Sequence, residues 1–186
     1  MIARSCVPVL AVAALIAGCG TTARNAAPPA ATVAHTFRGS PPQLASLHAQ
    51  ASELLGGGAQ AFKARLAQLR GYPVVVNLWA SWCEPCQSEF PVYQRVSVAF
   101  GRRVAFLGID GKDQNAAARS FLHRFPVSYP SYTDPQGAIE SAIQAVSYFP
   151  QTLYFNRRGT MVYDKAGPYL SVSELQRDIS FYLRVR

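Results

Sequence analysis

The chain has few of the residues that several large functional classes require. Its 186 residues include four cysteines and three widely separated histidines, His35, His48 and His123. A zinc site needs a second Cys or His pair at suitable spacing, and these histidines do not supply one. No phosphate-binding glycine loop, Ser/His/Asp arrangement or internal repeat stands out. The sequence therefore gives no sign of a zinc protein, a nucleotide-binding protein or a serine hydrolase.

Acidic residues are scarce too. Ten Asp and Glu stand against 18 Lys and Arg, which gives a formal net charge of +8. The basic residues are nearly all Arg and are spread along the chain, whereas nucleic-acid binding favours a dense basic patch with interleaved aromatics. We interpret the charge as a solvated surface, with attraction to anionic lipid or acidic partners as the lesser alternative, and expect no nucleic-acid partner.

Long apolar runs are missing as well, since none reaches the roughly 20 residues that a transmembrane helix needs. The stretch from Val7 to Ala17 follows a cationic start and ends in Gly18-Cys19, with small residues before a cysteine. This pattern is similar to that of bacterial lipoprotein precursors. The similarity implies cleavage before Cys19 and acylation of that residue, with loss of Cys6. An uncleaved anchor is the alternative and would leave the domain in the same compartment.

The composition divides the chain into three parts. We expect a signal peptide over 1–18, a flexible Ala/Pro/Thr-rich tether over 19–42, and one domain over 43–186. Apolar spacing predicts N-terminal helices over 43–55 and 59–69, within an addition that spans 43–70. A strand over 74–79, a helix over 85–100 and a strand over 104–109 predict a βαβ unit, and hence an α/β sheet. Further helices are expected over 116–125 and 139–145, strands over 152–155 and 160–164, and a last helix that opens with the capping box at Ser171.

The cysteines outside the leader form Trp82-Cys83-Glu84-Pro85-Cys86, directly after the apolar run 74–81. At a helix N-terminus, unpaired N–H groups and the helix dipole would stabilise a Cys83 thiolate. Pro85 suits the first turn of a helix. Cys86 comes round the same turn, so it could attack a mixed disulfide on Cys83 and release the substrate. The spacing indicates thiol-disulfide exchange with no metal and no cofactor beyond the cysteine pair.

Other roles for a Cys-x-x-Cys pair are half of a zinc site, haem attachment and a permanently closed structural disulfide. Haem attachment needs His directly after the second Cys, and Gln87 stands there. The structural disulfide stays open as an alternative.

The run Asn77 to Cys86, together with Pro91 five residues later, resembles the thioredoxin superfamily, in particular its membrane-tethered TlpA, ResA and CcmG/DsbE-like branch. The resemblance covers residues 71–186. It implies a thioredoxin-like fold with a central mixed sheet flanked by helices, a TlpA-type central insert, a helix kink at Pro91 and a cis peptide bond before Pro150, facing the two cysteines. Asn77 stands where cytoplasmic thioredoxins carry a buried Asp, and Glu84 is one candidate for the general base.

Two positions depart from the pattern of that branch. The segment Gly108 to Asp113 resembles a Tyr-Lys-Asp segment of the CcmG-type members, but Gly111 stands where those members have the aromatic residue. Phe149, before the expected cis-proline, replaces a small residue and would narrow substrate choice. Asp110 and Asp113 are candidates for an active-site role, with helix capping and solvated turn positions as the alternative.

The resemblance implies an extracytoplasmic thiol-disulfide oxidoreductase on a lipid anchor at Cys19. Such a protein would reduce disulfides of exported proteins, among them apocytochrome c, with electrons from a transmembrane thiol carrier. Cys83 would attack and Cys86 would resolve, supported by Trp82, Glu84, Pro85 and Pro150. Two rivals remain: a peroxiredoxin-like antioxidant enzyme, and a non-enzymatic envelope lipoprotein with a structural disulfide.

Overall fold

The computed structural model describes residues 28–146 and 148–185; the expected signal peptide and Cys19 lie outside the described residues. Its centre is a six-stranded sheet. The strands are β1 (Leu54–Leu55), β2 (Val74–Trp79), β3 (Ala105–Gly111), β4 (Ser131–Asp134), β5 (Gln151–Phe155) and β6 (Met161–Ala166). Their order is β1-β4-β3-β2-β5-β6. The first four in this order run parallel to one another, β5 runs antiparallel to β2, and β6 runs antiparallel to β5, so the predicted mixed sheet is confirmed.

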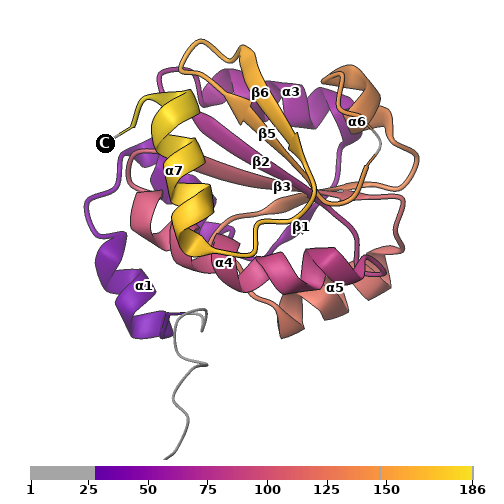
Figure 1. Cartoon of the computed structure of the whole chain (residues 1–186), viewed down its shortest axis with the longest axis horizontal. Helices are drawn as coiled ribbons and strands as arrows, with labels where there is room; N and C mark the ends of the chain where they lie inside the picture. Colours follow the sequence, from indigo (N-terminus) through magenta and orange to yellow (C-terminus); the bar gives the residue numbers. More distant parts are fainter. Residues whose placement is uncertain (1–27, 147, 186) are drawn as a thin grey trace, which may run out of the picture.

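Helices cover both faces of the sheet (Figure 1). They are α1 (Ala30–Thr36), α2 (Pro42–Ala49), α3 (Gly58–Gln68), α4 (Glu84–Phe100), α5 (Asn115–Arg124), α6 (Ala138–Ala142) and α7 (Val172–Leu183). Side chains from α2, α3 and α6 share one apolar cluster with the sheet, and side chains from α4, α5 and α7 share the other. In the described part of the chain no helix combines the length and the apolar character needed to cross a membrane.

The central strand β2 contributes side chains to both apolar clusters because successive side chains of a strand point to opposite faces. Val74, Val76 and Leu78 lie in the cluster with α2, α3 and α6, whereas Val75 and Trp79 lie in the cluster with α4. Asn77 has the same phase as the second set and is fully buried. The alternation therefore places one polar amide in the apolar layer between β2 and the α4 face.

Several local predictions are confirmed. The strand over 74–79 has the predicted bounds, and β2, α4 and β3 form the predicted βαβ unit with β2 and β3 parallel. Pro91 lies inside α4. The Ser171 hydroxyl accepts the N–H of Glu174 (3.2 Å), which is the expected cap of α7. The signal for each of these features lies within a few neighbouring residues, so the sequence alone was sufficient to predict them.

The expected tether over 19–42 is wrong in its described part, because α1 forms there. Alanine is the best helix former, and the run from Ala30 follows Pro29, which is the N-cap residue. Behind α1, Phe37 stacks on His48 of α2, with ring centroids 3.5 Å apart. The tether was predicted from its lack of large apolar side chains. That criterion does not detect an alanine-rich helix that is held to α2 by a single aromatic contact.

The helix predicted over 43–55 is too long. It ends at Ala49, and Leu54 and Leu55 instead form β1, parallel to Ser131 and Tyr132 of β4. The turn between them has Ser52 at a φ of 57°, and the Ser52 N–H donates to the carbonyl of Tyr129 (3.1 Å). Neither β1, the edge strand, nor β4 beside it was predicted, because both are short strands that pair only once distant segments meet.

Candidate active site

The two cysteines lie where β2 gives way to α4. Cys83 is the N-cap residue of α4, with Pro85 in the first turn. Cys83 and Cys86 are joined by a disulfide with their Cα atoms 5.3 Å apart. The Cys83 side chain is 4% exposed and that of Cys86 is fully buried. Cys83 is therefore the less buried of the two residues, and its role as the attacking sulfur stays a prediction.

Backbone N–H groups at the helix start face the accessible sulfur. The N–H of Cys86 donates to Sγ of Cys83 (3.2 Å). Donors and the positive end of a helix dipole favour a thiolate over a thiol. The local fold thus supplies the electrostatic stabilisation that an attacking Cys83 needs once the disulfide opens.

The loop before β5 lies beside the cysteines. The Phe149–Pro150 peptide bond is cis, as predicted. Phe149 meets the Trp82 ring edge-on, with centroids 5.3 Å apart. Trp82 is 58% exposed, and its indole N–H donates to the carbonyl of Lys112 (3.1 Å). These contacts bring the segment around Pro150 next to the residue that precedes Cys83.

Asp113 connects the insert to the active-site loop. Its carboxylate accepts the N–H of Ser81 and also the N–H of Gln114 (2.7 Å), the N-cap residue of α5. Asp113 therefore ties the residue that precedes α5 to the turn that leads to Cys83. An active-site role for Asp113 stays a prediction.

Asp110 lies at the end of β3, in register with Trp79 of β2. Its side chain is fully buried. Burial, with the negative charges of Asp113 and Asp134 nearby, raises the pKa of Asp110 to about 8. Such a carboxyl is protonated at neutral pH, so it can exchange a proton in the range where thiols react.

A second buried carboxyl, Glu89, lies behind the cysteines and was not among the predicted site residues. It follows Cys86 by three positions on α4, and residues three apart share one helix face. Glu89 is fully buried, whereas Glu84 in the first turn is exposed. Geometry thus puts Glu89, rather than Glu84, on the buried side of the helix with Cys86.

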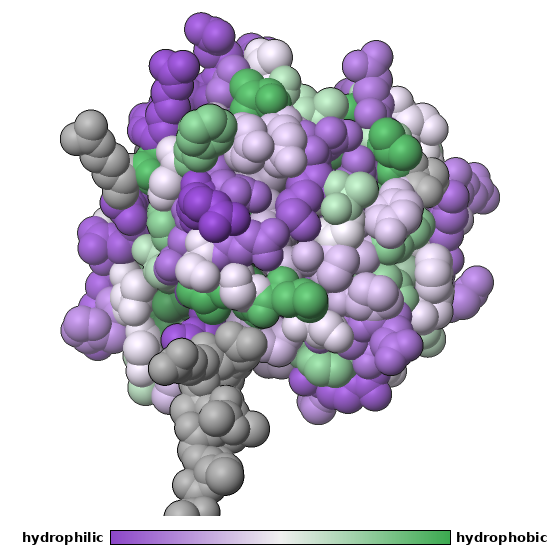
Figure 2. All heavy atoms as spheres, viewed as in Figure 1, coloured by the Kyte–Doolittle hydropathy of each residue, from purple (hydrophilic) through white to green (hydrophobic). Residues whose placement is uncertain are grey.

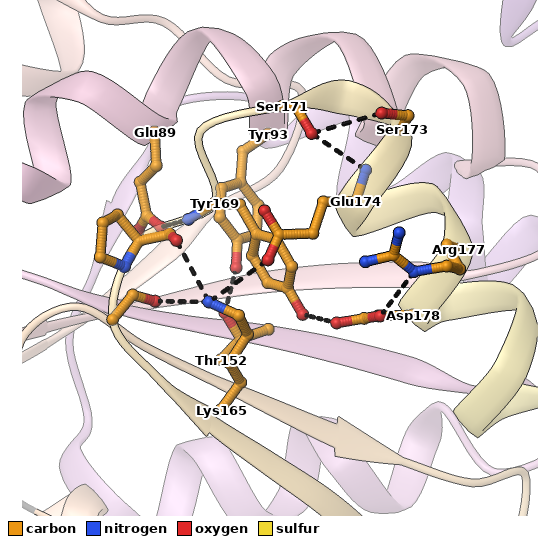
Figure 3. A network of polar contacts seen from close by, with 12 residues as sticks. Glu89, Tyr93, Thr152, Lys165, Tyr169, Ser171, Ser173, Glu174, Arg177 and Asp178 are labelled. Atoms are coloured by element: carbon orange, nitrogen blue, oxygen red, sulfur yellow. Dashed lines mark hydrogen bonds and ion pairs between the residues drawn. The ribbon is translucent and has the colours of Figure 1, made fainter.

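The surroundings of Glu89 form a polar network in the core (Figure 3). The N–H of Tyr169 donates to Oε2 of Glu89 (3.1 Å). Burial raises the pKa of Glu89 to about 8, and the Tyr169 N–H, the charge of Lys165 and the amide of Asn77 oppose that rise. Oε1 of Glu89 has no hydrogen-bond partner of good geometry among the described residues. A protonated Glu89 has an oxygen left over to take part in proton exchange.

Lys165 holds the loop that carries this donor. Its ammonium donates to the carbonyls of Gly167 (3.3 Å) and Pro168 (3.1 Å) and lies 4.3 Å from the centre of the Tyr169 ring. Glu174 of α7 is 3.8 Å away. The β6–α7 connection is thereby fixed against α4, which keeps the Tyr169 N–H on the Glu89 carboxyl.

Nothing at the site resembles a metal centre. Within residues 28–146 and 148–185, no three His, Cys, Asp or Glu side chains gather as ligands. The arrangement can instead carry out exchange between disulfides: an accessible sulfur at a helix N-terminus, a buried sulfur one turn on, and a carboxyl of raised pKa on the same helix face as the buried sulfur.

Comparison with known proteins agrees with this chemistry. The AhpC/TSA family model matches residues 47–167, more than half of the chain. The thiol:disulfide interchange protein DsbE of Pseudomonas fluorescens biotype C is 34% identical over 96 residues, which cover 51% of this chain and 52% of that protein. The thiol-disulfide oxidoreductase ResA of Bacillus subtilis is 30% identical over 98 residues, 52% of this chain and 54% of that protein. The chain spans about half the length of these curated relatives.

Solved structures share the fold. A secreted disulfide oxidoreductase of Mycobacterium tuberculosis, described as homologous to E. coli DsbE, superposes with a TM-score of 0.55. It is 26% identical, and the match covers 61% of this chain and 84% of that one. The thioredoxin-like fold expected from the sequence is confirmed.

Proposed function

Because the chain belongs to the AhpC/TSA family, we propose that it is an extracytoplasmic thiol-disulfide oxidoreductase that reduces disulfides of exported proteins. The single observation that carries the proposal is the cysteine pair at the start of α4, with Cys83 slightly exposed and accepting an N–H and Cys86 fully buried. The relatives named as thiol:disulfide interchange protein and thiol-disulfide oxidoreductase support the same reaction.

The reaction runs in two exchanges. The Cys83 thiolate attacks one sulfur of a substrate disulfide, which forms a mixed disulfide and releases the other substrate sulfur as a thiolate. Cys86 then loses its proton and attacks Sγ of Cys83, which closes the Cys83–Cys86 disulfide and releases the second substrate thiolate. Glu89 lies one turn along from Cys86 on the same face, and its deprotonated form, the minor form at neutral pH because its pKa is raised to about 8, is the one that would take that proton. The role of Glu84 as a base remains a prediction.

The finer assignments are part of the proposal. We infer a lipid anchor at Cys19, apocytochrome c as one substrate, and a transmembrane thiol carrier as the electron donor. The export-signal pattern before Cys19 supports the first, and the likeness to the DsbE and ResA proteins supports the other two. Pro150 and Trp82 would line the approach of the substrate to Cys83, because their loops meet there.

The test separates the roles of the two cysteines. Cys83→Ser is expected to abolish disulfide reductase activity, whereas Cys86→Ser is expected to accumulate mixed disulfides with substrates, visible on non-reducing gels and absent after reduction. Normal turnover by the Cys86→Ser variant would contradict the assignment. Trapping with that variant in cells would also identify the substrate.

Peroxide reduction by Cys83 is the second candidate function, and the match to the AhpC/TSA model is what favours it. A hydrogen peroxide consumption assay distinguishes the two, because we expect disulfide exchange without peroxide turnover. Rapid consumption of peroxide that survives in Cys86→Ser would favour this second function.

A further inference from the structure

The outer face of α7 combines basic and aromatic side chains. Leu175, Ile179 and Leu183 bury the inner face, while Arg177, Phe181 and Arg184 follow one another at helical spacing on the exposed side. Phe181 is 74% exposed, and its ring meets Tyr182 edge-on at 5.0 Å. A helix that exposes an aromatic ring between arginines has the composition of helices that lie on membrane surfaces.

The neighbouring β-hairpin extends this surface. Arg157 and Arg158, both exposed, form the turn between β5 and β6. A surface hollow of about 670 Å³ joins the hairpin to α7, and its lining consists of Asn156, Arg157, Arg158, Val162, Phe181, Tyr182, Leu183 and Arg184. The lining therefore includes three arginines and no carboxylate. We call Arg157, Arg158, Val162, Phe181 and Arg184 the basic-aromatic face.

The acidic side chains of α7 and β6 near this face bind other residues. Asp178 of α7 accepts the hydroxyl of Tyr169 (2.6 Å) and lies 3.7 Å from Arg177. Asp164 of β6 accepts the side-chain amide of Gln151 (3.3 Å). Since neither carboxylate lines the hollow, the charge presented by the basic-aromatic face is positive.

The basic-aromatic face lies at the end of the molecule opposite Cys83. The hairpin follows Phe155, which pairs with Val74, the first residue of β2, whereas Cys83 comes after the last residue, Trp79. Figure 1 shows the hairpin and the C-terminal end of α7 at the upper left and the start of α4 on the right. In the same view, Figure 2 shows hydrophilic side chains around a few apolar ones at the upper left.

The described chain begins beside the middle of α4, where Pro28 lines a surface hollow together with Gln94 and Val127. The carbonyl of Gly39, shortly after α1, accepts a hydrogen bond from Arg102 (3.3 Å), which follows the C-terminal end of α4. Ala105, three residues later, pairs with Val74. The segment from Pro28 to Gly39 therefore runs along the α4 side of the domain, and Figure 1 shows α1 at the lower left, apart from the hairpin at the top.

We propose that the basic-aromatic face docks on an anionic phospholipid surface. Arginine guanidinium groups bind phosphates in a bidentate geometry, and exposed aromatic rings beside them are suited to the headgroup level of a bilayer. Docked in this way, the domain holds Cys83 at the end away from the bilayer, where exported proteins can reach it. The inference goes beyond disulfide exchange and does not depend on it.

The test uses the full chain with Cys19→Ser, so that no acyl chain contributes. Sedimentation is measured with vesicles of phosphatidylcholine alone and of phosphatidylcholine with phosphatidylglycerol. Binding is expected only with the anionic lipid and is expected to weaken with salt. Replacing Arg157, Arg158 and Arg184 by Gln is expected to reduce affinity about a hundredfold, at about fivefold per arginine. Phe181→Ser is also expected to weaken binding, and the loss of affinity should be similar at low and high salt because the lost contact is apolar.

The matched control removes the same charge elsewhere, with Arg38, Arg119 and Arg124 replaced by Gln, all three being exposed. It is expected to retain most of the binding. Equal losses in the two triple variants would show that net charge alone is responsible and would overturn the proposal, as would binding to neutral vesicles or none to anionic ones. All variants should keep the wild-type thermal melt and exchange rate in solution. A protein that binds vesicles but lacks exchange activity would refute the proposed function while leaving this inference intact.

Discussion

Replacing Glu89 with Gln tests whether a carboxyl in the core is kept protonated at neutral pH. The carboxyl is fully buried on α4, and burial raises its pKa from 4.5 to about 8. Gln has nearly the same shape, and its carbonyl can accept the Tyr169 N–H that Glu89 now accepts. The substitution therefore removes the titration while leaving the packing and one hydrogen bond in place.

The direction of the effect follows from proton linkage. Between pH 4.5 and about 8 the folded protein keeps the Glu89 proton and the unfolded chain has lost it, so the free energy of unfolding falls as pH rises. At about 1.4 kcal/mol per pH unit, the penalty is about 1 kcal/mol at pH 5 and about 3 kcal/mol at pH 7. Gln carries no such penalty. We expect the stability difference between Glu89→Gln and the wild type to grow by about 2 kcal/mol over that range.

Urea unfolding of the oxidised protein at several pH values measures this difference. The wild-type profile contains a second contribution of the same sign, because the pKa of Asp110 is also raised to about 8. Glu89→Gln should therefore reduce the slope without removing it. Glu84→Gln is the matched control, since Glu84 lies on the same helix but is exposed, and it should leave the slope unchanged. Parallel profiles for the wild type and Glu89→Gln would refute the reasoning.

Three further predictions concern the potential, the anchor and one glycine. The Cys83–Cys86 pair should have a reduction potential nearer −270 than −120 mV, because the Glu84 carboxylate opposes the helix N-terminus at Cys83; a value above about −180 mV in glutathione buffers would indicate an oxidant or isomerase. Cys19→Ser should move the protein from the membrane fraction to a soluble or unprocessed form, and membrane attachment that survives salt extraction in a processed variant would contradict this. Gly111→Ala should lower the free energy of unfolding by about 1–3 kcal/mol, since its Cβ would lie 2.6 Å from Oε1 of Glu140 and 2.8 Å from Cζ of Phe149. Adding Phe149→Ala should recover part of that loss, and equal losses in both backgrounds would exclude the contact.

The sequence predicted those parts of the fold whose signals are local. The strand 74–79 is a continuous apolar run that ends at the cysteines, and α7 opens with a capping box that forms as expected. These signals occupy a few neighbouring residues, so no distant partner is needed to interpret them. The cysteine pair belongs to the same class, because its spacing and the apolar run that precedes it lie within one short stretch of chain.

The parts that were missed depend on contacts between distant segments. β1 and β4 are held by pairs such as Leu54 with Ser131, 77 positions apart, and neither segment has the length or alternation of a typical strand. Glu89 was missed for a different reason. A glutamate in a helix is ordinarily a solvated residue, but its position three residues after Cys86 indicates the same face as a buried sulfur, and that signal was available in the sequence.

Gly111 and Phe149, two separate departures from the related pattern, prove to be one feature of the structure. A Cβ built on Gly111 would lie 2.6 Å from Oε1 of Glu140, and 2.8 Å from Cζ and 2.9 Å from Cε1 of Phe149. The ring before the cis-proline thus occupies the space beside β3 that a side chain at position 111 would need, and from there it meets Trp82 edge-on. The two residues are 38 positions apart. The sequence therefore shows that an aromatic residue is missing at 111 and that one is added at 149, but not that the two positions are in contact. The aromatic ring beside Trp82 comes from the loop that carries Pro150, so a change at residue 149 should alter substrate choice and the packing of β3 together.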